Sequence, residues 1–275
     1  MGVLSGRSLL ALDHDIMKTV WITGASSGIG EALAKEYALA GFQLILSARR
    51  QDKLEQLKNN LHDSEKHLIV PLDVSKTDEI PAIVHATLEK IKQLDILINN
   101  AGISQRARAV DTSLEIDRQI FEVNFFGSVA MTRALLPALK RSAGAIMVIS
   151  SVTGKVQTPS RTAYCASKHA LHGWFDALRC EVWRDEIDVM LVTPGFIRTE
   201  LSYAALEADG TPRGKMDKNQ EKGMSANQAA KKIMAAQQRG VEEFYVGGIR
   251  ERGALWIKRF FPRIFSSMAK KFPEA

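Results

Sequence analysis

The chain has little of what marks secreted, membrane-spanning or metal-binding proteins. It has only two cysteines, Cys165 and Cys180, in 275 residues. Both fall on one predicted helix, about 22 Å apart, which is too far for a disulfide, so we expect free thiols in a reducing compartment. No run of about 18 apolar residues predicts a membrane-spanning helix. No cluster of ligand-type side chains predicts a metal site.

The N-terminus also lacks targeting features. The stretch MGVLSGRSLLALDHDIMKTVWITG has no basic start, long apolar core or cleavage site, so we expect no secretory signal. The opening MGVLSG departs from a myristoylation signal at Gly6, where serine or threonine is required. We therefore expect a cytoplasmic protein. A substantial share of the net charge of +6 comes from the C-terminal tail, so we expect no nucleic-acid partner.

Apolar runs alternate with helix-length segments along most of the chain. The runs predict strands at 18–24, 42–48, 67–74, 94–100, 145–151, 187–194 and 243–248. The segments predict helices at roughly 30–43, 51–62, 76–92, 113–140, 160–184 and 225–239. Most runs are almost continuously apolar, as in strands covered on both faces. The alternation predicts an α/β fold, a Rossmann-type doubly wound parallel sheet with helices on both faces.

No composition break divides the chain, so residues 1–252 are expected to form a single domain. Within it, residues 201–223 are charged, rich in turn residues and poor in apolar ones. Long loops of this kind are uncommon in compact domains, and one function for them is that of an active-site lid. We expect this segment to be a mobile substrate loop. Residues 253–275 then form a C-terminal extension.

The stretch TGASSGIG at 23–30 joins the first predicted strand to the first helix. Gly24 permits a tight turn, Gly28 lets backbone approach a pyrophosphate, and Gly30 lets the helix pack closely on the strand. The helix N-terminus then receives the phosphates. A glycine triplet in this setting predicts a dinucleotide site. We expect cofactor contacts from Gly24, Ser26, Ser27, Gly28, Ile29 and Gly30.

The end of the second strand, LSARRQD, bears on which dinucleotide binds. NAD-binding sheets place an acidic residue about 20 residues after the glycines to accept from the ribose 2′-hydroxyl. Here Ala48 stands at that place and Arg49 and Arg50 follow. A guanidinium can bind a 2′-phosphate through two hydrogen bonds, so the sequence favours NADP(H) over NAD. Solvated arginines at a helix start are the alternative.

Six motifs, in their order and spacing, resemble the short-chain dehydrogenase/reductase family, in its compact branch of single-domain oxidoreductases. The motifs are Thr-Gly-x-x-x-Gly-x-Gly at 23–30, NNAG at 99–102, Asn124 in EVNFFG, Ser151 ending VISS, Tyr164-x-x-x-Lys168, and PGFIRT at 194–199. They span roughly residues 18–248. The resemblance implies a sheet of about seven strands and a homo-oligomer.

The expected catalytic residues are Asn124, Ser151, Tyr164 and Lys168. A lone Tyr-x-x-x-Lys pair is usually a solvated helix face, but hydride transfer to a carbonyl needs a general acid, which Tyr164 would provide. Lys168, one turn further on, would stabilise the phenolate. Ser151 and Tyr164 would bind the substrate oxygen. By resemblance, Lys168 also binds the nicotinamide ribose, and Asn124 positions a lysine-bound water for proton relay.

Other cofactor contacts follow from positions that match the family. Asp73 and Val74 are expected at the adenine. Three residues of the NNAG motif are expected along the nucleotide cleft: Asn100, Ala101 and Gly102. Four residues of the PGFIRT motif are expected along the nicotinamide: Pro194, Gly195, Ile197 and Thr199. His169 and His172 match no family position and are assigned to packing or solvent.

The C-terminal extension leaves several interpretations open. Trp256, Phe260, Ile264 and Met268 recur at four-residue spacing among basic residues, and Pro262 interrupts the pattern, which indicates two short helices. The segment could pack on the protein or a sister subunit, lie on an anionic membrane surface, or form a wall of an apolar substrate pocket. We expect it and residues 201–223 to frame the entrance for an apolar substrate.

These observations predict an NADP(H)-dependent oxidoreductase that interconverts a carbonyl and a secondary alcohol in a small molecule. One alternative is a dinucleotide-binding regulatory or scaffolding protein without turnover. Another is a membrane-peripheral enzyme that acts on lipid or steroid carbonyls.

Overall fold

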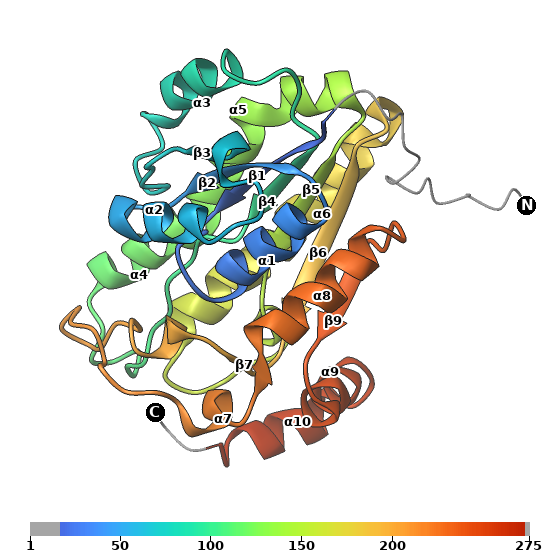
Figure 1. Ribbon diagram of the computed structural model, residues 1–275. Coiled ribbons are helices and arrows are strands. Elements are labelled where there is room, and N and C mark those ends of the chain that lie inside the picture. The colour runs from blue at the N-terminus through green and yellow to red at the C-terminus, as the bar shows by residue number, and fades with distance from the viewer. Residues whose placement is uncertain (1–16, 273–275) are drawn as a thin grey trace, which may run out of the picture.

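The computed structural model describes residues 17–272 of the chain. The expectations about residues 1–16, the absent signal and the absent myristoylation site, lie outside the described residues. The main sheet consists of parallel strands, each within one of the predicted runs: β1 Thr19–Thr23, β2 Gln43–Ser47, β3 Leu68–Ile69, β4 Ile96–Asn99, β5 Ala145–Ile149, β6 Asp188–Pro194 and β9 Glu243–Val246. Their order is β3-β2-β1-β4-β5-β6-β9, so the predicted seven-stranded doubly wound sheet is confirmed (Figure 1).

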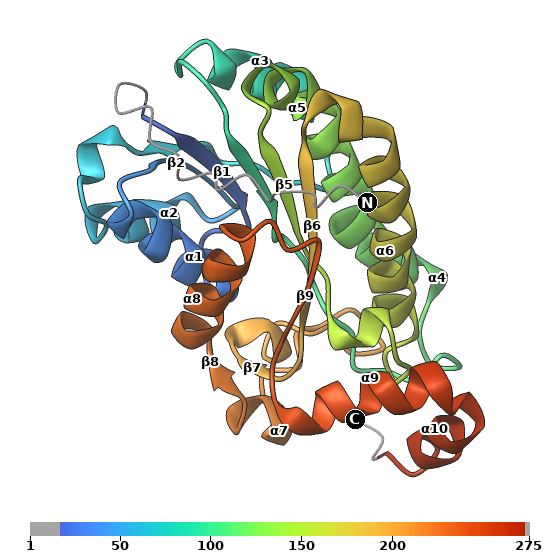
Figure 2. The same cartoon turned by 90° about the vertical axis from the view of Figure 1, so that its right-hand side faces the viewer.

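Helices cover both faces of this sheet, as predicted (Figure 2). They are α1 Gly28–Leu39, α2 Gln51–Asn59, α3 Ile80–Leu88, α4 Leu114–Phe121, α5 Gly127–Ser142, α6 Thr162–Val182 and α8 Ala226–Gln237. One face carries α1 and α8, and the other carries α3, α5 and α6. Ser225 and Gln228 form a capping box at the start of α8. Cys165 and Cys180 both lie on α6 as free thiols.

The alternation of side chains along each strand explains why the runs are apolar throughout. In β1, Val20 and Ile22 pack under α1, whereas Trp21 between them packs on the opposite face. In β4, Ile98 and its neighbour Leu97 likewise pack on opposite faces of the sheet. Successive side chains of a strand point to opposite faces, so a strand covered on both sides buries every residue.

The predicted helix at 113–140 is not continuous. Residues Glu122–Phe126 form a wider π-helical turn between α4 and α5. The Asn124 side chain lies in this turn and is held by Ile103, since its Oδ1 accepts from the Ile103 N–H at 2.8 Å and its Nδ2 donates to the Ile103 carbonyl at 3.0 Å. A single π-type turn often re-aims a side chain at a functional site.

The segment 201–223 contains more structure than the sequence indicated. It includes the short helix α7 Lys218–Glu221, and the two-residue strands β7 Ile197–Arg198 and β8 Met224–Ser225 pair just outside it. Leu206 joins the segment to the chain after β4, because its N–H donates to the Ser104 carbonyl at 2.9 Å and its carbonyl accepts from Arg106 at 2.8 Å. The mobility of this segment stays a prediction.

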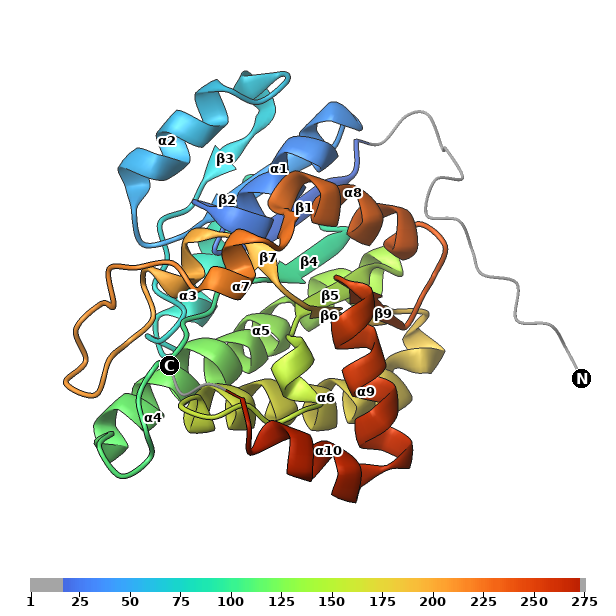
Figure 3. The same ribbon diagram turned by 90° about the horizontal axis from the view of Figure 1, so that it is seen from below.

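The C-terminal extension forms the two predicted helices, α9 Ile249–Phe260 and α10 Pro262–Ala269, at the carboxyl edge of the sheet (Figure 3). The stripe identified in the sequence does not form the packed face, since Trp256, Phe260, Ile264 and Met268 are all exposed. The chain turns at Phe261, so four-residue spacing does not follow one helical face.

Phe265 instead packs α10 onto the protein, together with Ala269, against Val152 and Val156. The Phe196 N–H donates to the Glu251 side chain at 3.2 Å, which ties α9 to the same edge. Among residues 17–272, no helix combines the length and apolar character needed to cross a membrane.

Candidate active site

A single cavity of about 1500 Å³ lies at the carboxyl edge of the sheet and gathers most of the predicted site residues. Of those named from the sequence, all but Gly30 and Asn124 line this cavity. The strand order reverses at β1, so the chain leaves β1 and β4 in opposite directions and opens a crevice between them. The structure thus brings the predicted phosphate loop and the predicted catalytic residues together, although they are far apart in the sequence.

The phosphate loop is shaped by its glycines. Gly24 and Gly28 have φ of +63° and +62°, a region that other residues seldom adopt. A Cβ on Gly30 would collide with the Gly24 carbonyl oxygen and the Asn100 amide, so only glycine fits there. The N-cap residue Ser27 makes no side-chain cap hydrogen bond, so its hydroxyl leaves the first turn of α1 open to a ligand. These features fit a dinucleotide pyrophosphate at the helix N-terminus.

Asn100 and Thr23 join the phosphate loop to the end of β4. Thr23 Oγ1 accepts from the N–H groups of Asn100 and Ala101, at 3.0 and 3.2 Å. The Asn100 amide donates to the carbonyls of Thr23 and Gly24, at 3.1 and 3.0 Å. The predicted cleft residue Asn100 therefore supports the loop as well as lining the cavity.

Arg49 and Arg50 lie at the end of the cavity that the phosphate loop forms. Both are exposed and line the cavity, and the Arg50 guanidinium lies 3.4 Å from the Ser26 hydroxyl. Asp73, also expected at the nucleotide, accepts from Ser75 through one carboxylate oxygen. The adenosine end of the predicted dinucleotide site thus carries positive charge beside the loop.

Asn124 lies behind the cavity wall rather than in it. It is fully buried, and its amide also donates to the Ser167 hydroxyl at 3.0 Å. A Cβ on Gly102 would lie 3.2 Å from Asn124 Oδ1 and 3.5 Å from Lys168 Nζ. The asparagine and the lysine therefore approach the same glycine.

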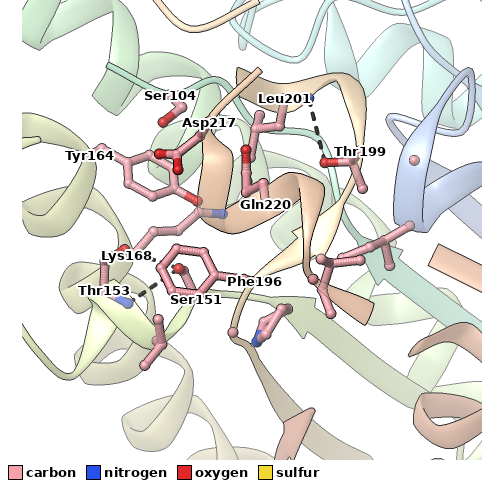
Figure 4. Close-up of a pocket in the computed structure, with 18 of the residues that line it drawn as sticks. Ser104, Ser151, Thr153, Tyr164, Lys168, Phe196, Thr199, Leu201, Asp217 and Gln220 are labelled. Atoms are coloured by element: carbon pink, nitrogen blue, oxygen red, sulfur yellow. Dashed lines mark hydrogen bonds between the residues drawn. The ribbon is translucent and has the colours of Figure 1, made fainter. Parts of the chain in front are cut away.

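Ser151, Tyr164 and Lys168 meet at the end of β5 and the first turns of α6 (Figure 4). Ser151 Oγ accepts from the Thr153 N–H at 3.2 Å and from its hydroxyl at 3.0 Å, which fixes the serine. Lys168 Nζ lies 5.9 Å from the centroid of the Tyr164 ring and donates to the Ile149 carbonyl at 2.8 Å.

Burial shifts the pKa values of the tyrosine and the lysine in opposite directions. It raises the pKa of Tyr164, although a hydrogen bond with Ser151 and the charges of Arg161 and Arg106 act to lower it. Burial lowers the pKa of Lys168 to about 8. Desolvation is the largest effect on the phenol, so burial favours its protonated form. The role of Lys168 in stabilising the phenolate stays a prediction.

Several cavity residues were not identified from the sequence. Ser104, Arg106, Arg161 and Asp217 come from three separate segments and line the cavity together. Figure 4 draws Asp217 and Ser104 with Tyr164. The resemblance covered only motif positions, and none of these residues is in a motif. The apolar wall from α9 and α10 was one of the interpretations left open for the extension, and the structure shows it: Ala254, Ile257, Phe265, Met268 and Phe272.

The two histidines near Lys168 lie outside the cavity lining, in agreement with their assignment to packing or solvent. His169 is exposed and its ring bonds the Cys165 carbonyl. His172 is buried, and its Nε2 lies 3.0 Å from the Ser150 hydroxyl. Burial, reinforced by the charge of Lys155, lowers the pKa of His172 to about 4, so the ring is neutral at pH 7.

Comparison with known proteins identifies relatives over nearly the whole chain. The sequence model of the family "short chain dehydrogenase" matches residues 18–209. The "Dehydrogenase/reductase SDR family protein 7-like" of Anopheles gambiae is 42% identical over 264 residues, 94% of this chain and 83% of the relative. The "Dehydrogenase/reductase SDR family member 7B" of Xenopus laevis is 38% identical over 269 residues, 93% of this chain and 83% of the relative.

Solved structures show the same fold. A short-chain dehydrogenase from Streptomyces avermitilis superposes with a TM-score of 0.79 at 28% identity, covering 93% of this chain and 97% of that one. An alcohol dehydrogenase from the archaeon Thermococcus sibiricus, complexed with 5-hydroxy-NADP, gives 0.73 at 28% identity, covering 85% and 97%. A 3-ketoacyl-(acyl-carrier-protein) reductase from Brucella melitensis, complexed with NADH, gives 0.73 at 28% identity, covering 85% and 98%.

We predict that His172 makes the protein less stable in mild acid. Its folded-state pKa of about 4 lies below the ordinary 6.5, so the unfolded chain takes up the proton first as the pH falls. Stability from this group is complete above about pH 6.5 and is lost toward pH 4. Between pH 7 and 5 the loss is about 2 kcal/mol. The free energy of unfolding in urea at these two pH values, for the wild type and His172→Gln, measures it. An equal pH dependence in both proteins would contradict the prediction.

Proposed function

The chain belongs to the short-chain dehydrogenase/reductase family, and on that premise we propose that it is an NADP(H)-dependent oxidoreductase that interconverts a carbonyl and a secondary alcohol. The observation that carries the proposal is that Ser151, Tyr164 and Lys168 line the same cavity as the phosphate loop. The dinucleotide supplies or accepts the hydride when bound. The protein's own residues then hold the substrate oxygen and move its proton.

Tyr164 is the proposed general acid, and the base in the reverse direction. Burial raises the pKa of the phenol, so it holds its proton at neutral pH and can donate it to an oxyanion. Ser151, fixed by Thr153, is placed to hydrogen-bond the same substrate oxygen. Its hydroxyl would orient the carbonyl for attack.

Lys168 is proposed to act on both the tyrosine and the nicotinamide ribose. With a pKa of about 8 it is mostly charged at pH 7, and an ammonium near the ring stabilises the phenolate left after donation. Asn124 is proposed to position a lysine-bound water for proton relay. The support for this role is that Asn124 and Lys168 approach the same face of Gly102.

The cofactor contacts, the domain organisation, the cellular setting and the oligomeric state are part of the same proposal. The cofactor contacts named from the sequence are proposed for the dinucleotide, with residues 1–252 as one domain and 201–223 as its mobile lid. The free thiols of Cys165 and Cys180 support a reducing, cytoplasmic setting. A homo-oligomer is proposed from the family resemblance.

We predict that Tyr164→Phe abolishes turnover and spares cofactor binding. Removal of a general acid costs about 10²–10⁴ in kcat. The measurement is NADPH oxidation with a panel of apolar ketones, alongside the Kd for NADPH from fluorescence titration. If the wild type binds NADPH but oxidises it no faster than the mutant with any ketone, the alternative of a regulatory protein without turnover is favoured.

The preference for NADP(H) rests on Arg49, with Arg50 beside it. A guanidinium that binds a phosphate contributes about 1.5–3 kcal/mol, so Arg49→Ala is expected to weaken NADPH about 10- to 100-fold. NADH binding is expected to change less than about threefold, since its ribose carries no phosphate to pair with. Arg141→Ala, which removes an exposed arginine of α5, is the control. Equal losses for both cofactors would show that Arg49 does not recognise the 2′-phosphate.

We also propose that α9 and α10 rest on an anionic membrane surface. The two helices and the turn between them expose four large apolar residues: Trp256, Phe260, Phe261 and Ile264. Basic residues are interspersed with them in the sequence: Lys258, Arg259, Arg263, Lys270 and Lys271. Apolar contact with lipid and attraction to acidic headgroups would act together. This position would suit an enzyme that acts on lipid or steroid carbonyls.

The membrane proposal predicts co-sedimentation with vesicles that contain phosphatidylserine, and less with pure phosphatidylcholine or at high salt. The variant Trp256→Ser/Phe260→Ser/Ile264→Ser keeps the packed face at Phe265 and is expected to lose most of the binding. Val110→Ser, which removes an exposed apolar side chain elsewhere, is the control. If this face instead joins two copies, the triple variant will change the mass in sedimentation velocity and leave vesicle binding as it was.

A further inference from the structure

Three arginines converge on the cavity wall beside Tyr164. Arg106 lies after β4, Arg161 just before α6, and Arg213 in the 201–223 segment, and all three line the cavity. Arg161 and Arg106 share one carboxylate, Asp217 Oδ2, at 2.7 and 3.5 Å. Two guanidinium groups therefore depend on one partner for neutralisation.

The remaining positive charge is poorly compensated. Arg213 forms a long ion pair with Glu207, in which 3.9 Å separates Nε from Oε1. Among the described residues, the Nε atoms of both Arg106 and Arg213 are buried without a hydrogen-bond partner. Arg106 is only 3% exposed. A buried charge with few partners is costly, so the negative charge of an anion in the cavity would stabilise the cluster.

Arg106 keeps its charge at neutral pH. Burial and the nearby charge of Arg161 lower its pKa to about 10, still well above neutrality. Its Nη1 donates to the Ser104 hydroxyl at 2.8 Å and to the Gln105 carbonyl at 2.7 Å. The guanidinium is thus fixed in place by partners within the protein, and it contributes its positive charge to the cluster.

The cluster lies on the substrate side of the catalytic residues. Arg106 and Arg161 line the cavity together with Tyr164, and both pair with Asp217, which Figure 4 draws beside the tyrosine. Arg49 and Arg50, by contrast, border the phosphate loop. Over the whole lining, ten basic side chains face four acidic ones, so an anionic ligand is favoured.

The rest of the substrate end is apolar. Its wall combines residues after β5 with the inner side of α9 and α10: Val152, Val156, Ala254, Ile257, Phe265 and Phe272. An apolar wall beside a cationic cluster fits an amphiphile.

We propose that the substrate is a carbonyl compound that carries an oxyacid group, a carboxylate or a phosphate, on an apolar chain, and that Arg106, Arg161 and Arg213 bind that group. This inference rests on the proposed reductase function. The Arg161–Asp217 ion pair also holds the 201–223 segment over the cavity. The oxyacid group of the substrate would therefore bind at the point where residues 201–223 meet the rest of the cavity wall.

Charge-matched substrate pairs test the proposal. One pair is a medium-chain γ-oxo fatty acid and its methyl ester. The other is the phosphate monoester of a long-chain hydroxy ketone and the free hydroxy ketone. In NADPH oxidation, the anionic member of at least one pair is expected to have a kcat/KM about 10- to 100-fold higher. Which pair shows the larger ratio distinguishes carboxylate from phosphate.

Variants of the cluster separate recognition from a structural role. Arg213→Gln is expected to raise KM for the anionic substrate about tenfold more than it raises KM for the neutral partner. Arg106→Gln is expected to do the same, with its folding checked by circular dichroism, and Arg141→Gln serves as the control. Equal losses for charged and neutral partners would show that the arginines only hold the segment, and would overturn the proposal.

A binding measurement keeps this inference separate from the proposed activity. Calorimetry with the NADP⁺-loaded protein compares laurate and dodecyl phosphate with dodecanol. We expect at least one anion to bind about 10-fold or more tightly than the alcohol, and Arg213→Gln to remove the difference. Turnover of neutral ketones without anion preference would refute the inference alone. Anion binding without turnover of any ketone would refute the reductase and retain the anion site.

Discussion

The hydrogen bonds between Thr23 and Asn100 join the two strand ends on which the site depends. They hold the ends of β1 and β4 together at the point where the sheet order reverses. The Asn100 amide also fixes the carbonyl of Gly24, and the close approach of Gly30 to both leaves no room for a side chain. Once this junction is formed, the N-terminus of α1 and the end of β5 open into the same crevice.

Burial is the second constraint, and it governs the chemistry. Tyr164 and Lys168 are almost inaccessible to solvent, so each is driven toward its neutral form. The Lys168 ammonium is held by the Ile149 backbone carbonyl and not by a carboxylate. Its positive charge is therefore not neutralised by this partner and can act on the tyrosine. Arg106 and Arg161 add positive charge from the substrate side. The reacting groups thus lie in an environment that is poor in water and rich in positive charge.

Much of the fold and the central site could be predicted from the sequence, because these features have local causes. A strand covered on both faces reads as an apolar run, as residues 96–98 do, and Gly24 and Gly28 have conformations that few other residues tolerate. The arginine cluster could not be predicted. Arg106, Arg161 and Asp217 lie in three loops, and only the folded chain brings them together. The packing of α9 and α10 could not be predicted from the four-residue spacing either, because the chain turns at Phe261 between the two helices.

The π-helical turn at Glu122–Phe126 has a consequence for how this sequence can change. Such a turn amounts to one residue inserted into an α-helix. Because the wider turn absorbs this extra residue, its deletion would restore a continuous α-helix and leave α4 and α5 in nearly their present orientations. What the deletion would change is the local direction of the turn, and with it the hydrogen bonds between Asn124 and the Ile103 backbone. The turn therefore serves the placement of Asn124 rather than the packing of α5 on the sheet.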